Sequence, residues 1–306
     1  MTAPIVPPSD ASIARAADIL QSGGLVAMPT ETVYGLACDA ANPKAVACLY
    51  AAKGRPSFNP LIAHVLDLDA AQREGHFSET AQSLAAKYWP GPLTLVVPVA
   101  ASHTVCDLAR AGLDTIALRS PKHPVARTLL SHFGGPIVAP SANPSGQISP
   151  THPEHVLKDM GDKVDLILDG GPCEIGIEST ILSCLLEEDP TLLRAGSIDA
   201  GAPPIGETSE TTPIAPGQLS RHYAPKASLR LNVTEPNEGE AHLGFGSING
   251  SINLSSNSDL EEAAANLFAM LRSLDTTHRR IAVAPIPHTG IGMAINDRLA
   301  RAAKRD

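Results

Sequence analysis

The chain has 306 residues, of which 43% are hydrophobic and 18% are charged, so it can bury one large core or two ordinary ones. Its net charge of −9 argues against a protein that coats nucleic acid by bulk electrostatics. No apolar run approaches the roughly 20 residues of a membrane span, and residues 1–10 contain no basic stretch followed by an apolar one. We therefore expect a cytoplasmic protein that binds neither membranes nor nucleic acid stably.

The first two-thirds of the chain alternates helical periodicity with short apolar runs. Ser9 or Asp10 can cap a first helix, which Gly23 and Gly24 end. Further helices are predicted over residues 43–52, 79–89, 124–133 and 153–160. Strands are predicted over residues 25–28, 61–65, 93–99, 115–118, 137–139, 166–168, 180–186 and 192–194. Strands interleaved with helices indicate an α/β fold.

The composition changes near Asp199. Residues 200–226 are rich in Pro, Gly, Thr and Ser and lack apolar periodicity, which is typical of a linker or a long ordered loop. A second unit follows, with strands predicted over residues 229–233, 242–245 and 281–285 and helices over 258–274 and 291–304. We therefore expect a first domain over residues 1–199, a linker over residues 200–228, and a smaller C-terminal α/β domain over residues 229–306.

The five cysteines predict reduced thiols that pack as small hydrophobic side chains. Their number is odd, their spacings are wide, and no Cys-x-x-Cys pair occurs. This pattern argues against a disulfide framework and against a structural zinc site. The cysteines are Cys38, Cys48, Cys106, Cys173 and Cys184.

Four polar segments interrupt apolar strand ends, where α/β proteins bind their ligands. They are residues 29–36, residues 53–64, residues 139–143, and residues 176–180 followed by Arg194. Lysine and arginine supply positive charge for phosphates, while small hydroxyls and an amide orient a polar substrate. Together, the segments favour a binding site with positive charge.

Each segment also has a plainer interpretation. Thr32 can be an ordinary turn hydroxyl, and Lys53 and Arg55 follow a helix, whose C-terminal end attracts cations. Ser141 and Asn143 can make side-chain turns. A histidine in an apolar strand, such as His64, is more often a core residue than a ligand. None of these residues would establish a site alone.

The motifs occur in an order that resembles a known family. They are Pro29-Thr-Glu-Thr-Val-Tyr-Gly-Leu36, Lys53-Gly-Arg55 with Asn59-Pro-Leu-Ile62, Trp89-Pro-Gly-Pro-Leu-Thr94, Ala139-Pro-Ser-Ala-Asn143 and Glu178-Ser-Thr180. The chain resembles the YrdC family, whose Lys-x-Arg and Ser-x-Asn signatures are both intact. Two later motifs resemble the linker and the C-terminal domain of the family's long, two-domain form: residues 215–217 with His222-Tyr-Ala-Pro225, and Ile295-Asn-Asp-Arg-Leu299.

The resemblance implies the activity of an L-threonylcarbamoyladenylate synthase, a nucleotidyltransferase. Such an enzyme makes threonylcarbamoyl-AMP and pyrophosphate from L-threonine, bicarbonate or CO2, and ATP with Mg²⁺. The product feeds the threonylcarbamoyladenosine modification of tRNA, so a downstream tRNA threonylcarbamoyl transferase complex is the implied partner. The implied fold is a twisted open mixed α/β sheet, with the smaller α/β domain after it.

The resemblance also implies roles for particular residues. Those expected to contact L-threonine are Thr32, His64, Arg119, Ser179 and the backbone at Ala139. Those expected to contact the nucleotide are Arg55, Asn59, Thr115, Ser141, Ser149, Arg194 and Tyr223. The signature residues expected to support catalysis are Lys53, Arg55, Ser141 and Asn143. No side chain is expected to bind a metal ion directly.

The sequence leaves open two other functions and two interpretations of the linker. An RNA-binding or assembly factor could use the same basic cavity without catalysis, although the net charge of −9 and the scarcity of aromatic residues count against it. A YrdC-like module of a carbamoyl-phosphate-dependent enzyme would normally come with acylphosphatase and zinc segments, which we do not find. The linker is either a passive tether or a lid. We expect Tyr223 to dock over the nucleotide cavity, so that the linker, and not the C-terminal domain, completes the site.

Overall fold

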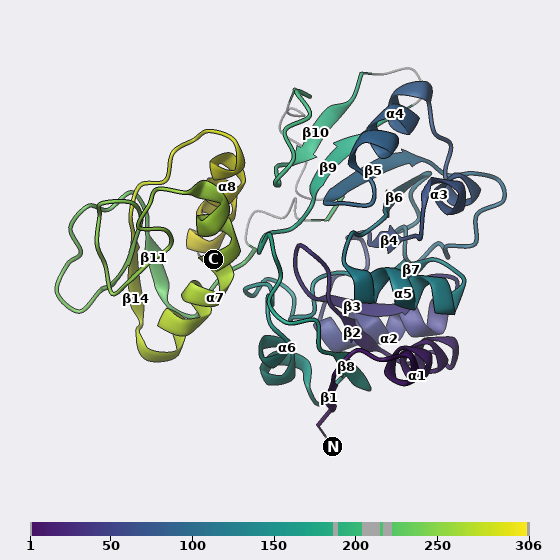
Figure 1. The fold of residues 1–306 in the computed structure, drawn as a ribbon, viewed down its shortest axis with the longest axis horizontal. Helices are drawn as coiled ribbons and strands as arrows, with labels where there is room; N and C mark the ends of the chain where they lie inside the picture. Colours follow the sequence, from purple (N-terminus) through teal and green to yellow (C-terminus); the bar gives the residue numbers. More distant parts are fainter. Residues whose placement is uncertain (1, 186–188, 204–214, 217–221, 305–306) are drawn as a thin grey trace.

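The computed structural model describes residues 2–185, 189–203, 215–216 and 222–304. It contains a ten-stranded sheet and a four-stranded sheet, which define a large and a small domain (Figure 1). The strands of the large domain are β1 (Ile5–Val6), β2 (Val26–Met28), β3 (Gly35–Asp39), β4 (Ile62–His64), β5 (Leu93–Pro98), β6 (Thr115–Arg119), β7 (Ile137–Val138), β8 (Leu166–Leu168), β9 (Thr180–Ser183) and β10 (Thr191–Arg194). Its helices are α1 (Asp10–Gln21), α2 (Pro43–Lys53), α3 (Leu68–Glu74), α4 (Glu79–Tyr88), α5 (Pro124–Phe133) and α6 (Pro153–Met160).

The large sheet is mixed, as the family resemblance implies. Its strand order is β1-β8-β2-β3-β7-β4-β6-β5-β9-β10. Neighbours such as β4 and β6 run parallel, whereas β2 and β3 run antiparallel. Because alternate residues of a strand face opposite sides, Val26 and Met28 pack with α1 and α5, while Ala27 packs in the core that contains α2, α4 and α6.

Local capping signals explain why the helix boundaries follow the sequence closely. Ser9 caps α1 through a capping box, and Asn42 and Ser78 accept backbone hydrogen bonds at the starts of α2 and α4. Helix α5 begins at a proline and ends at Gly134, whose φ of 76° lies in the left-handed region. The predicted boundaries of α5 and α6 are confirmed.

Four short elements were not predicted. Strand β3 begins in the last two residues of the polar motif that starts at Pro29, and it consists of Gly, Leu, Ala, Cys and Asp without a β-branched residue. Helix α3 buries only Ala71 and Glu74, so it leaves almost no apolar period. Strands β1 and β13 are each two residues long.

The small domain consists of a parallel sheet and two helices. Its order is β11-β14-β12-β13, and its elements are β11 (Ser228–Arg230), β12 (Ala241–Gly244), β13 (Ile252–Asn253), α7 (Leu260–Thr277), β14 (Arg280–Val283) and α8 (Ile291–Ala303). Figure 1 shows α7 and α8 between this sheet and the large domain. Within the part of the chain that the structure covers, no helix is long and apolar enough to cross a membrane.

The two domains share one apolar cluster. Val33, Ile148 and Ile177 of the large domain pack with residues of α7 that include Phe268. The contact is close at Gly176, where an added Cβ would lie 2.5 Å from the Cα of Ala265. Much of the expected linker, residues 204–214 and 217–221, lies outside the described residues. All five cysteines are free. Cys38, Cys173 and Cys184 are buried as small hydrophobic side chains, as expected, whereas Cys48 is exposed.

Candidate active site

A cavity opens where several strand ends of the large sheet meet the end of the linker. It receives residues from strands β4, β6 and β10, from the loops after β2, α2 and β7, and from the loop before β9. Its lining consists of Thr32, Val33, Arg55, Ile62, His64, Arg119, Ala139, Pro140, Ser141, Glu178, Ser179, Arg194, Pro216, His222 and Tyr223. Three arginines therefore face one enclosed space, which favours an anionic ligand.

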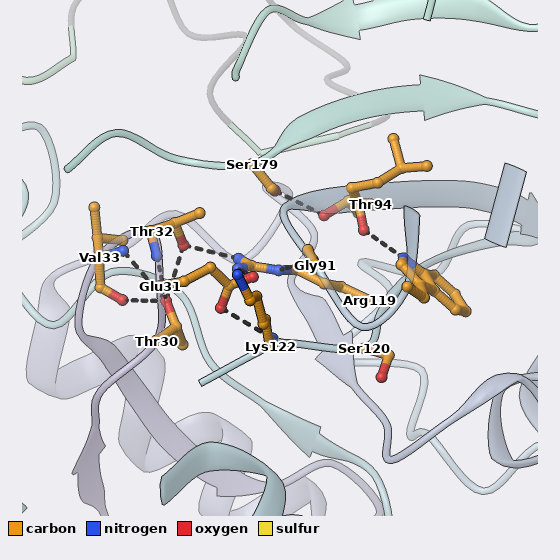
Figure 2. A network of polar contacts seen from close by, with 12 residues as sticks. Thr30, Glu31, Thr32, Val33, Gly91, Thr94, Arg119, Ser120, Lys122 and Ser179 are labelled. Carbon is orange, nitrogen blue, oxygen red and sulfur yellow. Dashed lines mark hydrogen bonds and ion pairs between the residues drawn. The ribbon is translucent and has the colours of Figure 1, made fainter. Parts of the chain in front are cut away.

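Arg119, at the end of β6, is the centre of a buried network that Figure 2 shows from close by. Its Nη2 donates to Glu31 Oε1 at 2.7 Å, its Nη1 to the hydroxyl of Thr32 at 2.9 Å, and its Nε to the carbonyl of Gly91 at 3.2 Å. The Thr32 hydroxyl also lies 2.9 Å from that of Thr30. A guanidinium has five N–H donors, so two remain after these three contacts, enough to meet both oxygens of a carboxylate.

Glu31 fixes Arg119 in place, and sequence reasoning did not assign it a role. Burial opposes ionisation of Glu31, but the charge and hydrogen bond of Arg119 outweigh it and hold the pKa of the carboxyl below its usual range. The backbone N–H of Lys122 adds a hydrogen bond to Oε2 at 3.1 Å. The one available signal was a glutamate between two threonines in the first motif.

Lys53 and Arg55 contribute to the part of the cavity formed by the loop after β7 and the loop after α2. The Lys53 Nζ donates to the carbonyl oxygens of Ser141 and Asn143, so this lysine holds the loop after β7 from behind. Arg55 donates to the carbonyl of Asn59 at 3.2 Å and still lines the cavity. Burial lowers the pKa of Lys53 and lowers that of Arg55 to about 10. Lys53 does lie in the last turn of α2, but both side chains are buried and donate to loop carbonyls, so attraction to the helix end alone does not account for them.

Ser179 and Arg194 form a third group. Arg194 donates from Nη2 to the Ser179 hydroxyl and from Nε to the Ser179 carbonyl, both at 3.0 Å. The Ser179 hydroxyl also lies 2.8 Å from that of Thr94, as Figure 2 shows. His64 is fully buried nearby, and burial together with the charge of Arg119 lowers its pKa to about 3. This imidazole is neutral at physiological pH and its Nδ1 has no hydrogen-bond partner.

Tyr223 lies in the lining of the cavity, as docking of the linker requires. Its ring packs against that of His222, with 4.0 Å between the centroids, and stacks on Phe268 of α7 at 5.6 Å. The tyrosine is therefore held by the small domain as well as by the linker. Among the described lining residues none belongs to the small domain, in line with the expectation that the linker completes the cavity, although α7 packs against the tyrosine from behind.

Some expected site residues do not reach the lining. Lys53, Asn59, Asn143 and Ser149 lie buried behind it, and the side-chain nitrogen and oxygen of Asn59 have no hydrogen-bond partner. Thr115 is also absent from the lining, and it lies far from Arg119. It pairs with Pro98 at the opposite end of β6 from Arg119, and four residues of strand span about 13 Å.

Two family models match the chain. One, described as Telomere recombination and named for Sua5, YciO and YrdC, covers residues 18–196, and the other, described as Threonylcarbamoyl-AMP synthase, C-terminal domain, covers residues 179–304. A Threonylcarbamoyl-AMP synthase of Bacillus subtilis is 39% identical over 96% of this chain and 94% of its own length. The chain belongs to the Sua5/YrdC family.

Solved structures agree with this family assignment. The structure of P. abyssi Sua5 complexed with L-threonine has a TM-score of 0.89 and 36% identity, and the match covers 99% of this chain and 98% of that one. A P. abyssi Sua5 variant, in which a histidine and a tyrosine are replaced by alanine, also has a TM-score of 0.89, with 34% identity over 98% of this chain and 96% of its own. E. coli YciO, with 22% identity and a TM-score of 0.58, shares the fold.

The site of this Sua5/YrdC family member does not fit a metal ion held by the protein. Within the described ranges, no group of three or more His, Cys, Asp or Glu side chains could hold one. The two carboxylates closest to the network and the cavity, Glu31 and Glu178, are engaged by Arg119 and Arg298.

Proposed function

We propose that this chain is a threonylcarbamoyl-AMP synthase. It converts L-threonine, bicarbonate or CO2, and ATP into threonylcarbamoyl-AMP and pyrophosphate, for the threonylcarbamoyladenosine modification of tRNA. The observation that carries the proposal is the convergence of two residue sets on one cavity. Thr32, His64, Arg119 and Ser179 meet Arg55, Ser141 and Arg194 there, although they are spread over 163 positions of the chain, from 32 to 194.

Arg119 is the proposed anchor for the carboxylate of L-threonine. Its position is fixed by Glu31 and Gly91, and its two remaining N–H donors can bind both carboxylate oxygens. The related structure with L-threonine supports an amino-acid site in this fold. His64 is a neutral group and a poor proton acceptor, because its pKa is lowered to about 3, so it acts by hydrogen bonding.

The chemistry joins two anionic reactants. The neutral amine of threonine attacks the carbon of CO2, loses a proton, and becomes a carbamate. A carbamate oxygen then attacks the α-phosphorus of ATP, and the bond from that phosphorus to the leaving pyrophosphate breaks. Fixed positive charge offsets this repulsion at no cost of reorganisation, and Arg55 and Arg194 are placed on the lining to supply it. No covalent enzyme intermediate is required.

The linker residues close the cavity as it stands. With His222 and Tyr223 in place, it contains about 50 Å³ of free space, whereas small-molecule sites typically provide about 300–1,000 Å³. These residues must therefore move for ATP to enter. Their return would protect the carbamate, which loses CO2 when it is protonated, and threonylcarbamoyl-AMP, which water hydrolyses. The passive-tether alternative does not account for a buried tyrosine in the lining.

Mg²⁺ enters this proposal only as the counter-ion that ATP carries. The residues at the site do not fit a protein-held ion, and no step above depends on one. We place the reaction in the cytoplasm and the next step in a tRNA threonylcarbamoyl transferase complex.

The deciding experiment incubates the purified chain with ATP, labelled L-threonine and bicarbonate. We expect labelled threonylcarbamoyl-AMP and pyrophosphate in equal amounts, and no pyrophosphate when threonine is omitted. Binding of RNA without ATP turnover would instead support the RNA-binding alternative and refute the proposal.

A further inference from the structure

Glu178 places a negative charge in a cavity that must accept anions. It is the one Asp or Glu among the described lining residues, and it is 7% exposed. A buried carboxylate left without a partner would repel the carbamate and the polyphosphate. The surroundings of Glu178 therefore affect what the cavity can bind.

Both oxygens of Glu178 have partners, and one of these comes from the small domain. Ser149 donates its hydroxyl hydrogen to Oε1. Arg298 of α8 donates from Nε to Oε2 at 3.0 Å. Arg298 is 1% exposed, so its aliphatic stem and guanidinium are enclosed where the two domains meet.

Arg298 also contacts Tyr223, and one of its nitrogens makes no hydrogen bond. Its guanidinium carbon lies 5.3 Å from the centre of the Tyr223 ring, within the range of a cation–π interaction. Its Nη1 donates to Asp297 at 2.9 Å, while its Nη2 is buried without a hydrogen-bond partner. One side chain of the small domain thus connects the carboxylate in the cavity to the tyrosine that closes it.

The position of Glu178 also affects Arg194, one of the arginines that line the cavity. Glu178 precedes Ser179, and Arg194 is held by both the hydroxyl and the carbonyl of Ser179. A displaced Glu178 would therefore displace the backbone on which Arg194 depends.

We propose that Arg298 is a positioning residue for adenylate synthesis, through which the small domain neutralises Glu178 and orients Tyr223 over the nucleotide. This inference rests on the proposed function. It makes the small domain part of the electrostatics of the site, and it explains why α8 carries a fully buried arginine at a domain boundary.

A structural role in holding the domains together is the main competing explanation, and the chain offers a matched control. Arg272 of α7 also crosses the boundary, where it bonds Asp159 and the carbonyl oxygens of Ile148 and Ser149. It does not line the cavity. Loss of Arg272 would weaken docking without exposing an uncompensated charge to the substrates.

The test compares steady-state kinetics and thermal unfolding of the full chain with those of Arg298→Met, Arg298→Met/Glu178→Gln and Arg272→Met. We expect Arg298→Met to raise KM for ATP on the order of tenfold or more, because it leaves a buried carboxylate unpaired. The added Glu178→Gln change should bring KM for ATP most of the way back to the value of the parent. Arg272→Met should lower the unfolding temperature and, because it leaves the charge of Glu178 paired, raise KM for ATP much less than Arg298→Met does.

Three results would overturn the inference. They are an unchanged KM in Arg298→Met, the same KM increase in Arg272→Met, and no rescue by Glu178→Gln in a double variant that unfolds at the temperature of the parent. If the parent chain itself makes no adenylate, the proposed function fails, and that outcome is separate from all three.

Discussion

Arg119 and Glu31 form an ion pair at 2.7 Å with side chains only 4% and 3% exposed. The pair joins the end of β6 to the loop after β2 (Figure 2). Breaking such a pair by removing one charge is costly, because the other charge stays buried. Arg119 is therefore both a proposed substrate anchor and a group whose position depends on Glu31.

We expect Glu31→Gln to destabilise the fold by about 3–5 kcal/mol, measured by urea unfolding at pH 7. The pKa of Glu31 is lowered in the folded state, so its contribution is present above the unfolded value of about 4.5 and is lost as pH falls below it. The difference between parent and variant should therefore narrow below pH 4.5. An equal difference at pH 7 and pH 3.5 would contradict the assigned pairing.

His64 should affect stability over a different pH range. Its pKa is about 3 when folded and about 6.5 when unfolded, so its contribution is complete above pH 6.5 and is lost as pH falls toward 3. Replacing it with a group that does not titrate, in His64→Gln, should flatten the decline between pH 6 and pH 4 by up to about 1.4 kcal/mol per pH unit. Parallel unfolding curves for parent and variant would show that His64 titrates normally.

Lys53→Ala and Arg55→Ala should both reduce adenylate synthesis, but for different reasons. Each change to alanine should reduce adenylate synthesis by about 3–4 kcal/mol in rate terms, by analogy with the loss of an oxyanion-hole donor. Lys53→Ala removes the support of the Ser141 loop, so we expect it also to lower the unfolding temperature. Arg55→Ala removes a fixed positive charge from the lining without removing the support of that loop, so its effect should fall mainly on kcat. Unchanged pyrophosphate release in either variant would refute the assignment.

The sequence predicted the elements whose signals are local. Helices α5 and α6 begin at prolines, and a glycine follows each, so their boundaries could be predicted without tertiary information. Helix α3 and strand β3 could not, because one is too short and the other too poor in β-branched residues to show a period. Tertiary contacts decide their conformation.

Some residues of the site could likewise be predicted from the sequence, and others could not. The family resemblance led to Thr32, Arg119 and Ser179, which the fold brings to one cavity. Glu31 and Arg298 stand in the quoted motifs but were assigned no role, because their roles depend on partners 88 and 120 positions away. Thr115 was assigned to the nucleotide by the family resemblance, and it lies outside the lining, at the opposite end of β6 from Arg119.

The cavity should select threonine over serine weakly and over valine strongly. Val33, Ile62 and Ala139 line it and can contact a methyl group, which supplies only about 1–3 kcal/mol of discrimination. A missing hydroxyl leaves buried polar groups without a partner and costs more. In kcat/KM measurements, serine should be a weak substrate and valine nearly inert. Valine turning over as fast as serine would contradict this order.

Tyr223 should be required for efficient adenylate formation. Its ring lines the cavity, stacks on Phe268 and lies below the guanidinium of Arg298, so Tyr223→Ala removes the contacts that hold the lid closed. We expect a sharp loss of threonylcarbamoyl-AMP, with pyrophosphate released in excess of product because water reaches the intermediates. Tyr223→Phe keeps the stacking and should retain most of the activity.

Truncation after Asp199 provides the second test of the lid. The change removes Tyr223 and the whole small domain, and it uncovers Val33, Ile148 and Ile177, which pack against that domain in the full chain. We expect a shortened protein with activity at or below that of Tyr223→Ala and with lower solubility, because an apolar surface is exposed. Activity equal to the parent would make the linker a tether. A severe loss on truncation, combined with a silent Tyr223→Ala, would mean that closure matters but depends on another residue, of which the neighbouring His222 is the first to test.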